Sequence, residues 1–188
     1  MSIKATDSAG VASANAALNI KIMDDAPVAT NANLTSTAAN AQILAKASGD
    51  IIFGSGTDIT TQGGKQVFWS DSDANGAGAI VSTNTSGNYG VFTSNGGDII
   101  MAGGAGATSP TGSAYGLQAV NLTYATLNAG NGDITMRGTS SGTTSYGIGL
   151  RYFAGTSLTG RNITLVGTGA VSSSNYLANW GVSLESAS

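Results

Sequence analysis

The sequence contains no cysteine and no histidine, and only 9% of its residues are charged. Without cysteine there are no disulfides or thiolate metal sites, and without histidine there are no imidazole bases or imidazole metal ligands. The seven lysines and arginines are scattered through a chain of net charge −3, which argues against a nucleic-acid partner. No run of 18 apolar residues occurs, so the sequence predicts no membrane span.

Proline is also scarce, whereas glycine and small polar residues are abundant. The chain has 2 prolines and 28 glycines in 188 residues, and glycine is about twice as frequent as in ordinary proteins. The hydrophobic share of 41% is enough to form a core, which a disordered chain would lack. This mixture predicts many short strands that are joined by tight turns.

A short phrase recurs along the chain. Gly49-Asp50-Ile51 returns as Gly97-Asp98-Ile99 and as Gly132-Asp133-Ile134, and more loosely as Arg161-Asn162-Ile163. Each copy starts a β-type run from a turn. Recurrence at a nearly constant spacing indicates a solenoid, in which each repeat covers the apolar face of the next.

Aligning the first apolar residue of each run predicts coils of about 32 residues. The aligned residues are Leu34, Val67, Ile99, Ile134 and Ile163, with spacings of 33, 32, 35 and 29. Each coil also shows a second and a third run. The predicted second strands are Ile51–Phe53, Gly78–Ser82, Tyr115–Ala119, Tyr146–Leu150 and Trp180–Leu184, and the predicted third strands are Thr57–Thr61, Val91–Asn95, Ala125–Ala129 and Thr156–Gly160.

The sequence therefore predicts an all-β fold, a right-handed parallel β-helix of about five coils with three short strands each. The first copy of the phrase falls on a second strand, and the later copies fall on first strands. The alternative over Thr37–Lys46 is a short helix that caps the solenoid. Alternation over residues 18–22, with an earlier run at 2–6, predicts an N-terminal β-hairpin or strand remnant. We expect two domains, 1–30 and 31–188.

The N-terminal segment resembles the end of a bacterial cadherin-like or Ig-like repeat. The resemblance rests on Ala5-Thr6-Asp7 and on Met23-Asp24-Asp25-Ala26-Pro27-Val28. It implies that residues 1–30 are the tail of such a domain, and that Asp7, Asp24 and Asp25 help to bind an interdomain Ca²⁺. The alternative is a polar linker that ends in an extended step before proline.

Residues 34–185 resemble filamentous-haemagglutinin-like and autotransporter-like β-helix repeats of large bacterial surface adhesins. The resemblance is carried by the stretch 58–80 and by the phrases at 94–101 and 132–136. It implies a stalk segment of a longer exported protein, located outside the cell or on the bacterial surface. The implied role is attachment or biofilm formation, without catalysis. The implied partners are glycans, host or cell-surface proteins, and neighbouring repeats of the same chain.

Asp71, Asp73 and Asn75 form a second candidate calcium site. They occupy alternate positions of Asp71-Ser72-Asp73-Ala74-Asn75-Gly76, which matches the first half of an EF-hand loop. The twelfth position is Ser82, so the bidentate glutamate is missing. The alternative is a solvated turn at a coil corner. A calcium-stabilised binding module therefore stays open as a function.

Asp98 and Asp133 are a candidate catalytic pair, with Asn162 at the equivalent place in the following coil. Paired carboxylates catalyse glycoside hydrolysis, so a carbohydrate-active β-helix enzyme is one alternative function. The same aspartates suit the turns that start each coil, and Asn162 indicates that the acid is dispensable there. We therefore expect no catalysis and assign these residues to turn formation.

Aromatic residues suggest a glycan-binding module as a further alternative. Tyr115, Tyr146 and Trp180 are each followed by glycine and are expected to form a ladder, either on the surface or inside the solenoid. Phe68-Trp69 and Tyr152-Phe153 add aromatic rings. The arginines that could accompany a glycan patch are Arg137, Arg151 and Arg161. The threonines are not expected to form the regular columns of an ice-binding face.

Overall fold

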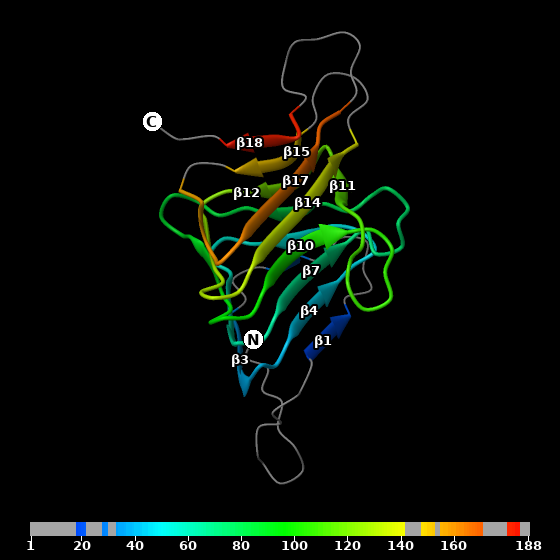
Figure 1. The fold of residues 1–188 in the computed structure, drawn as a ribbon. Coiled ribbons are helices and arrows are strands. Elements are labelled where there is room, and N and C mark those ends of the chain that lie inside the picture. Colours follow the sequence, from blue (N-terminus) through cyan, green and yellow to red (C-terminus); the bar gives the residue numbers. More distant parts are fainter. Residues whose placement is uncertain are drawn as a thin grey trace.

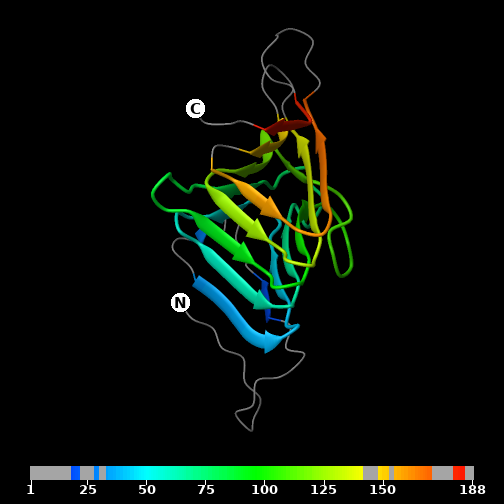
Figure 2. The same ribbon diagram turned by 60° about the vertical axis from the view of Figure 1, so that its left-hand side comes forward.

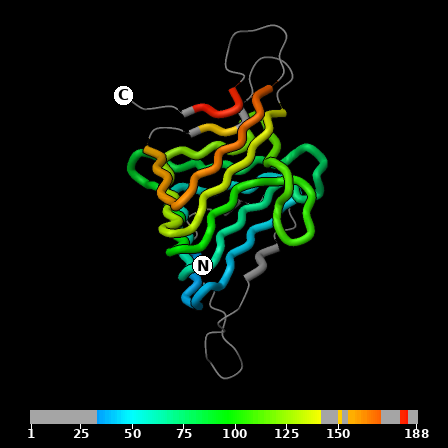
Figure 3. The backbone as a smooth tube through the Cα atoms, in the orientation of Figure 1, coloured from blue at the N-terminus to red at the C-terminus, as the bar shows by residue number. Residues whose placement is uncertain are grey.

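The computed structural model describes residues 18–21, 28–29, 33–141, 148–152, 155–170 and 180–184, and within these residues the fold is all-β with no helix. The strands form three parallel sheets, which we call A, B and C. Along the chain the strands visit A, then B, then C, and repeat. The described residues thus form a parallel β-helix of five coils and two strands of a sixth, stacked from the blue end to the red end in Figures 1 and 3. The predicted fold class is confirmed.

Sheet A is seen face-on in Figure 1. It consists of β1 (Leu18–Lys21), β4 (Ile43–Lys46), β7 (Gln66–Ser70), β10 (Ile99–Gly103), β14 (Ile134–Ser140) and β17 (Ile163–Thr168). A short strand, β11 (Ala114–Gly116), pairs with the second half of β14 after β10 has ended.

Sheets B and C complete each coil. Sheet B contains β2 (Val28–Ala29), β5 (Ile51–Phe53), β8 (Ile80–Ser82), β12 (Gln118–Leu122), β15 (Ile148–Tyr152) and β18 (Val182–Leu184). Sheet C contains β3 (Asn33–Ala39), β6 (Asp58–Gln62), β9 (Gly90–Thr93), β13 (Ala125–Asn128) and β16 (Ser157–Thr159). Figure 2 brings sheet C forward, with its strands running side by side from blue to orange.

The strand register corrects the predicted alignment of the first coils. The residues in line on sheet A are Leu18, Ile43, Gln66, Ile99, Ile134 and Ile163, so the spacings are 25, 23, 33, 35 and 29. Leu34 lies instead in sheet C opposite Ile59, and Val67 lies one position past the partner of Ile99. The alignment failed because it matched apolar residues, whereas this column contains a glutamine. The later coils are longer because they carry loops at 71–79 and 104–113.

The predicted strands of sheets B and C agree closely with the structure where it describes them, except for Tyr115–Ala119. That stretch is divided between β11 of sheet A and β12 of sheet B, which begins at Gln118. The helix considered for Thr37–Lys46 is wrong, because these residues are the end of β3, a turn and β4. β1 pairs in parallel with β4, and β2 pairs in parallel with β5, so the solenoid sheets continue N-terminal of residue 31. The strand expected at 2–6 lies outside the described residues, and the cadherin-like or Ig-like assignment of residues 1–30 stays a prediction.

The core lies between the three sheets and is filled by aligned side chains. Phe68 from sheet A, Phe53 from sheet B and Phe92 from sheet C meet there with ring centroids 4.9–5.5 Å apart in edge-to-face geometry. Gln66 is also fully buried and links two sheets, because its Nε2 donates to the carbonyl oxygens of Ile59 (3.1 Å) and Thr93 (2.9 Å) of sheet C. Each sheet therefore contributes to one continuous core.

Candidate functional site

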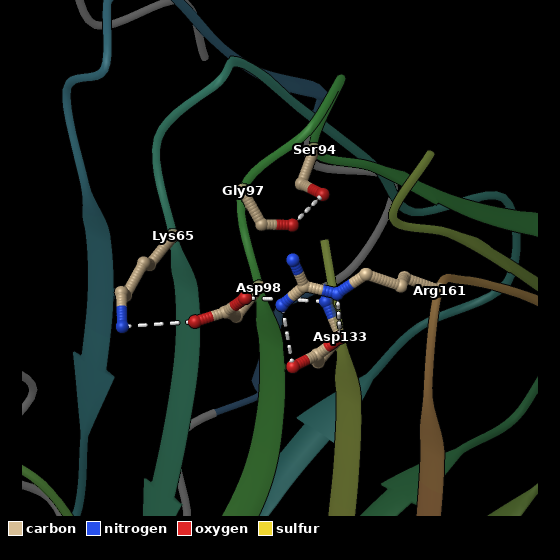
Figure 4. A network of polar contacts seen from close by, with 6 residues as sticks. All are labelled: Lys65, Ser94, Gly97, Asp98, Asp133 and Arg161. Carbon is tan, nitrogen blue, oxygen red and sulfur yellow. Dashed lines mark hydrogen bonds and ion pairs between the residues drawn. The ribbon is translucent and has the colours of Figure 1, made fainter. Parts of the chain in front are cut away.

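The candidate acids lie in one row along the starting edge of sheet A. Asp98, Asp133 and Asn162 immediately precede the aligned residues of β10, β14 and β17, and Lys65 holds the same place before β7. Backbone bonds of 2.9 Å join successive coils here, since the amides of Ile99 and Ile134 donate to the carbonyls of Asp133 and Asn162. Figure 4 shows Lys65, Asp98 and Asp133 of this row from close by. The expected equivalence of these positions is confirmed.

Side chains add a second set of contacts along the same row. Lys65 Nζ lies 2.9 Å from Asp98 Oδ2, and the Asp133 amide donates to Asp98 Oδ1 at 3.1 Å. Arg161 donates two hydrogen bonds to Asp133, from Nε to Oδ1 at 2.9 Å and from a terminal nitrogen to Oδ2 at 3.0 Å. Asn162 Nδ2 also donates to Asp133 Oδ1 at 3.0 Å. We call this row the coil-start ladder (Lys65, Asp98, Asp133, Arg161 and Asn162). Its two carboxylates, Asp98 and Asp133, lie between the cations Lys65 and Arg161.

The same use of aspartate occurs at other strand starts. Asp50 Oδ1 accepts the amide of Ala79 at 2.7 Å, and Asp58 Oδ1 accepts the amide of Val91 at 3.2 Å. In each case the donor is the residue of the next coil that stands in register with the aspartate. The aspartate of the repeated phrase is therefore a contact between coils as well as part of a turn.

The ladder lowers the pKa values of both carboxyl groups. The Lys65 ammonium, by its hydrogen bond, is the main cause of the lowered pKa of Asp98, and partial burial opposes it. For Asp133, the Arg161 guanidinium is the main cause of the lowered pKa, and Asn162 adds to it. A general acid needs a raised pKa instead. Two carboxylates held ionised by cations therefore suit a structural contact better than a catalytic pair.

The glycine of the phrase permits the close approach of coils at the same corner. A Cβ atom at Gly97 would lie 2.2 Å from the carbonyl oxygen of Gly64, and one at Gly132 would lie 2.1 Å from that of Gly97. The blocking atoms are backbone, so they cannot move aside without separating the coils. Thr61 and Ser94 bind these carbonyls with their hydroxyl groups, at Gly64 (2.6 Å) and at Gly97.

The candidate calcium loop is held by hydrogen bonds of its own. Asp71 is 4% exposed, and its Oδ1 accepts the amides of Gly76 (3.1 Å) and Ala77 (3.3 Å). Asp73 Oδ2 accepts from Asn75 Nδ2 at 2.9 Å. The sequence placed these three residues in one turn, and the structure shows the turn stabilised by their side chains. A calcium ion at Asp71, Asp73 and Asn75 stays a prediction.

The other calcium candidates, Asp7, Asp24 and Asp25, lie outside the described residues. In the part of the chain that the structure describes, no three histidine, cysteine, aspartate or glutamate side chains group as metal ligands. Within the same part, no helix has the length and apolar character that a membrane crossing requires.

The expected aromatic ladder is not formed by the residues that the structure describes. Tyr115 lies in β11 of sheet A opposite Thr139, whereas Trp180 precedes β18 of sheet B. Their equivalence was wrong because β11 returns the chain to sheet A after loop 104–113. Tyr146 and Phe153 lie outside the described residues, and Tyr152 lies in β15.

Phe68 and Trp69 have separate roles. Phe68 is in the core, whereas Trp69 belongs to the opposite face of sheet A and is nevertheless only 1% exposed. Its indole N–H donates to the Gly104 carbonyl at 2.6 Å, and Lys46 Nζ lies 3.8 Å from the ring centroid. Loop 104–113 therefore covers Trp69, so the indole ring is not accessible for stacking on a glycan.

The register reveals two surface features that the sequence analysis missed. Sheet C carries an outward column of small polar residues, Thr35, Thr60, Thr93, Asn128 and Thr159. Beside this sheet, Tyr89 and Tyr124 pack edge-to-face with centroids 5.4 Å apart, and Tyr89 is 42% exposed. Unequal coil lengths hide both features in the sequence, because the members of the column become equivalent only through the strand register. Among the predicted arginines, Arg161 is in the ladder and Arg137 donates to the Thr111 carbonyl at 3.5 Å.

Comparison of the chain with family models, with curated proteins and with solved structures finds no match.

We predict that Gly97→Ala destabilises the fold by roughly 3 kcal/mol, at the upper end of the usual cost of overpacking. The added methyl group would meet the Gly64 backbone at 2.2 Å. Gly87→Ala is the matched control, because a Cβ there has nothing within 4 Å. Its effect should stay within about 0.5 kcal/mol. Urea unfolding followed by circular dichroism measures both, and equal stabilities would contradict the close packing of coils.

We also predict that the coil-start ladder makes stability fall in acid. Because folding lowers the pKa values of Asp98 and Asp133, their contribution is full above about pH 4 and is lost as the pH falls through the folded pKa values. The Asp98→Asn/Asp133→Asn variant should show a shallower loss of the urea midpoint between about pH 5 and pH 2. Asp73→Asn, whose carboxylate bonds Asn75 within its own turn, is the control. If the urea midpoint fell equally steeply with pH in all three proteins, the ladder would not be a cause of the acid sensitivity.

Proposed function

We propose that this chain is a structural and adhesive stalk segment of an exported bacterial surface protein. The observation that carries the proposal is the use of the polar groups at the coil starts. Asp50, Asp58, Asp98 and Asp133 each bind the following coil. These carboxylates are hydrogen-bonded to the next coil, so they hold the stack together.

The outer surface supports an adhesive role with neutral partners. Only 9% of the residues are charged, and sheet C presents hydroxyl and amide groups in a regular column. Such groups donate and accept hydrogen bonds without the cost of desolvating a charge. They suit the hydroxyl-rich surface of a polysaccharide matrix. The extracellular or cell-surface location belongs to the same proposal.

A glycan-binding module is the second candidate, and one observation favours it. Tyr89 and Tyr124 offer aromatic surface at the border of sheet C, and Tyr124 adopts a left-handed backbone with φ of 45°. A bulky residue in this region is strained, and strain of this kind is often kept for function. Sugar rings stack on such exposed aromatic side chains.

The adhesive stalk predicts attachment without turnover. Beads coated with the folded chain should be retained on polysaccharide-coated surfaces more strongly than uncoated beads. The same surfaces should release no new reducing ends during the incubation. Tyr89→Ala separates the two candidates, because it should weaken retention only if the tyrosine pair holds a sugar.

The result against the stalk is catalysis. Release of sugar products by the wild-type chain, lost in a folded Asp98→Asn/Asp133→Asn variant, would show that the ladder carboxylates are an active site. Equal retention of coated and uncoated beads would contradict the adhesive role.

A further inference from the structure

Tyr89 and Tyr124 hold the same place in two neighbouring coils. The residues that follow them, Gly90 and Ala125, stand opposite each other in β9 and β13, so the backbones of the two tyrosines are separated by one strand spacing of about 4.8 Å. The two rings pack edge to face with centroids 5.4 Å apart, and Tyr89 is 42% exposed. The fold therefore holds two phenol groups together at a position that small molecules in solution can reach.

Glycine stands in this position in the coils on either side of the pair. By the same register, Gly56 is the equivalent of Tyr89 in the preceding coil, and Gly155 is the equivalent of Tyr124 in the following coil. Gly56, Tyr124 and Gly155 all have a left-handed backbone, with φ of 73°, 45° and 75°. Glycine adopts this conformation at little cost, whereas a bulky residue is strained there. A tyrosine that is kept at such a corner indicates that its side chain has a use.

Gly155 also shows how close the reactive carbons of the two rings are. When two tyrosines couple oxidatively, the atoms that join are the Cε carbons, which flank the carbon that bears the hydroxyl group. A Cβ atom at Gly155 would lie 3.1 Å from Cε1 of Tyr124 and 3.1 Å from Cε1 of Tyr89. The two Cε1 atoms are therefore no more than twice that distance apart, a separation that a change of side-chain rotamer can close.

We propose that Tyr89 and Tyr124 are a site of oxidative cross-linking, at which a dityrosine bond joins two neighbouring coils. The oxidant is hydrogen peroxide, acting through a haem peroxidase. Each phenol gives up one electron and its hydroxyl proton and becomes a tyrosyl radical. The two radicals combine through a Cε–Cε bond, and each of these carbons then passes its hydrogen to the oxygen of its own ring. The two electrons and two protons that were released reduce one molecule of hydrogen peroxide to two molecules of water.

The bond would add a kind of contact that the chain otherwise lacks. The sequence has no cysteine, so no disulfide joins its coils. A covalent link between Tyr89 and Tyr124 would restrict the unfolded chain, and such a restriction stabilises the folded chain. Because the fold holds both phenols at one corner, coupling within one chain is favoured over coupling between chains.

Treatment of the whole 188-residue chain, in dilute solution, with a haem peroxidase and hydrogen peroxide tests this inference. The expected product is a monomeric chain that shows dityrosine fluorescence and is lighter by two hydrogen atoms. Mass spectrometry of its peptides should find Tyr89 joined to Tyr124. Tyr89→Phe and Tyr124→Phe should each lose this product. Both variants should keep the circular dichroism spectrum, because phenylalanine retains the packed ring and removes only the hydroxyl group.

Tyr115→Phe is the matched control, because Tyr115 lies in β11 of sheet A and not beside the pair. The treated control and the treated wild-type chain should both unfold at a higher urea concentration than the treated Tyr124→Phe variant. A folded wild-type chain that forms no intramolecular dityrosine would overturn the inference. Retention of the product in Tyr89→Phe, or its equal loss in Tyr115→Phe, would also overturn it. None of these results depends on retention by a polysaccharide, so this inference and the adhesive role fail separately.

Discussion

The parallel pairing of each coil with the next is the interaction on which the rest of this structure depends. Two residues of the repeated phrase make it possible at the start of sheet A. Gly97 and Gly132 let the backbones of adjacent coils approach to distances that any side chain would block. Asp98 Oδ1 accepts a hydrogen bond from the backbone amide of Asp133 in the next coil. The isoleucine that follows fills the core. The phrase thus combines close backbone approach, strand register and burial of an apolar side chain. Together these let the coils stack in a chain with few charges and no disulfides.

This constraint also explains the distribution of chemistry over the molecule. Carboxylates that are needed between coils are held by Lys65 and Arg161 and have lowered pKa values, so they are poor proton donors. Outside these contacts, sheet C presents a column of hydroxyl and amide groups beside the tyrosine pair. These features are consistent with the proposed role as a scaffold.

Much of the fold could be predicted from the sequence, because strand runs and turn residues are local signals. The three-strand coil, and the position of the first phrase on sheet B, followed from these signals alone. Coil length could not be predicted, because the buried Gln66 breaks the apolar column and loop 104–113 adds residues between strands. The ladder was predicted as a row but not as a contact between coils. The burial of Trp69 depends on a loop that covers an outer face, which hydrophobic periodicity does not reveal.

A pair of engineered cysteines tests the register between coils most directly, because the chain has no cysteine of its own. Val91 and Thr126 stand opposite each other in β9 and β13. Their Cα atoms should be about 4.8 Å apart, within the range of a disulfide. We predict that Val91→Cys/Thr126→Cys forms an intramolecular disulfide on mild oxidation. We also predict that Val91→Cys/Asn128→Cys, displaced by two residues to about 8 Å, does not. A disulfide in the displaced pair and none in the aligned pair would contradict the stacking described for this chain.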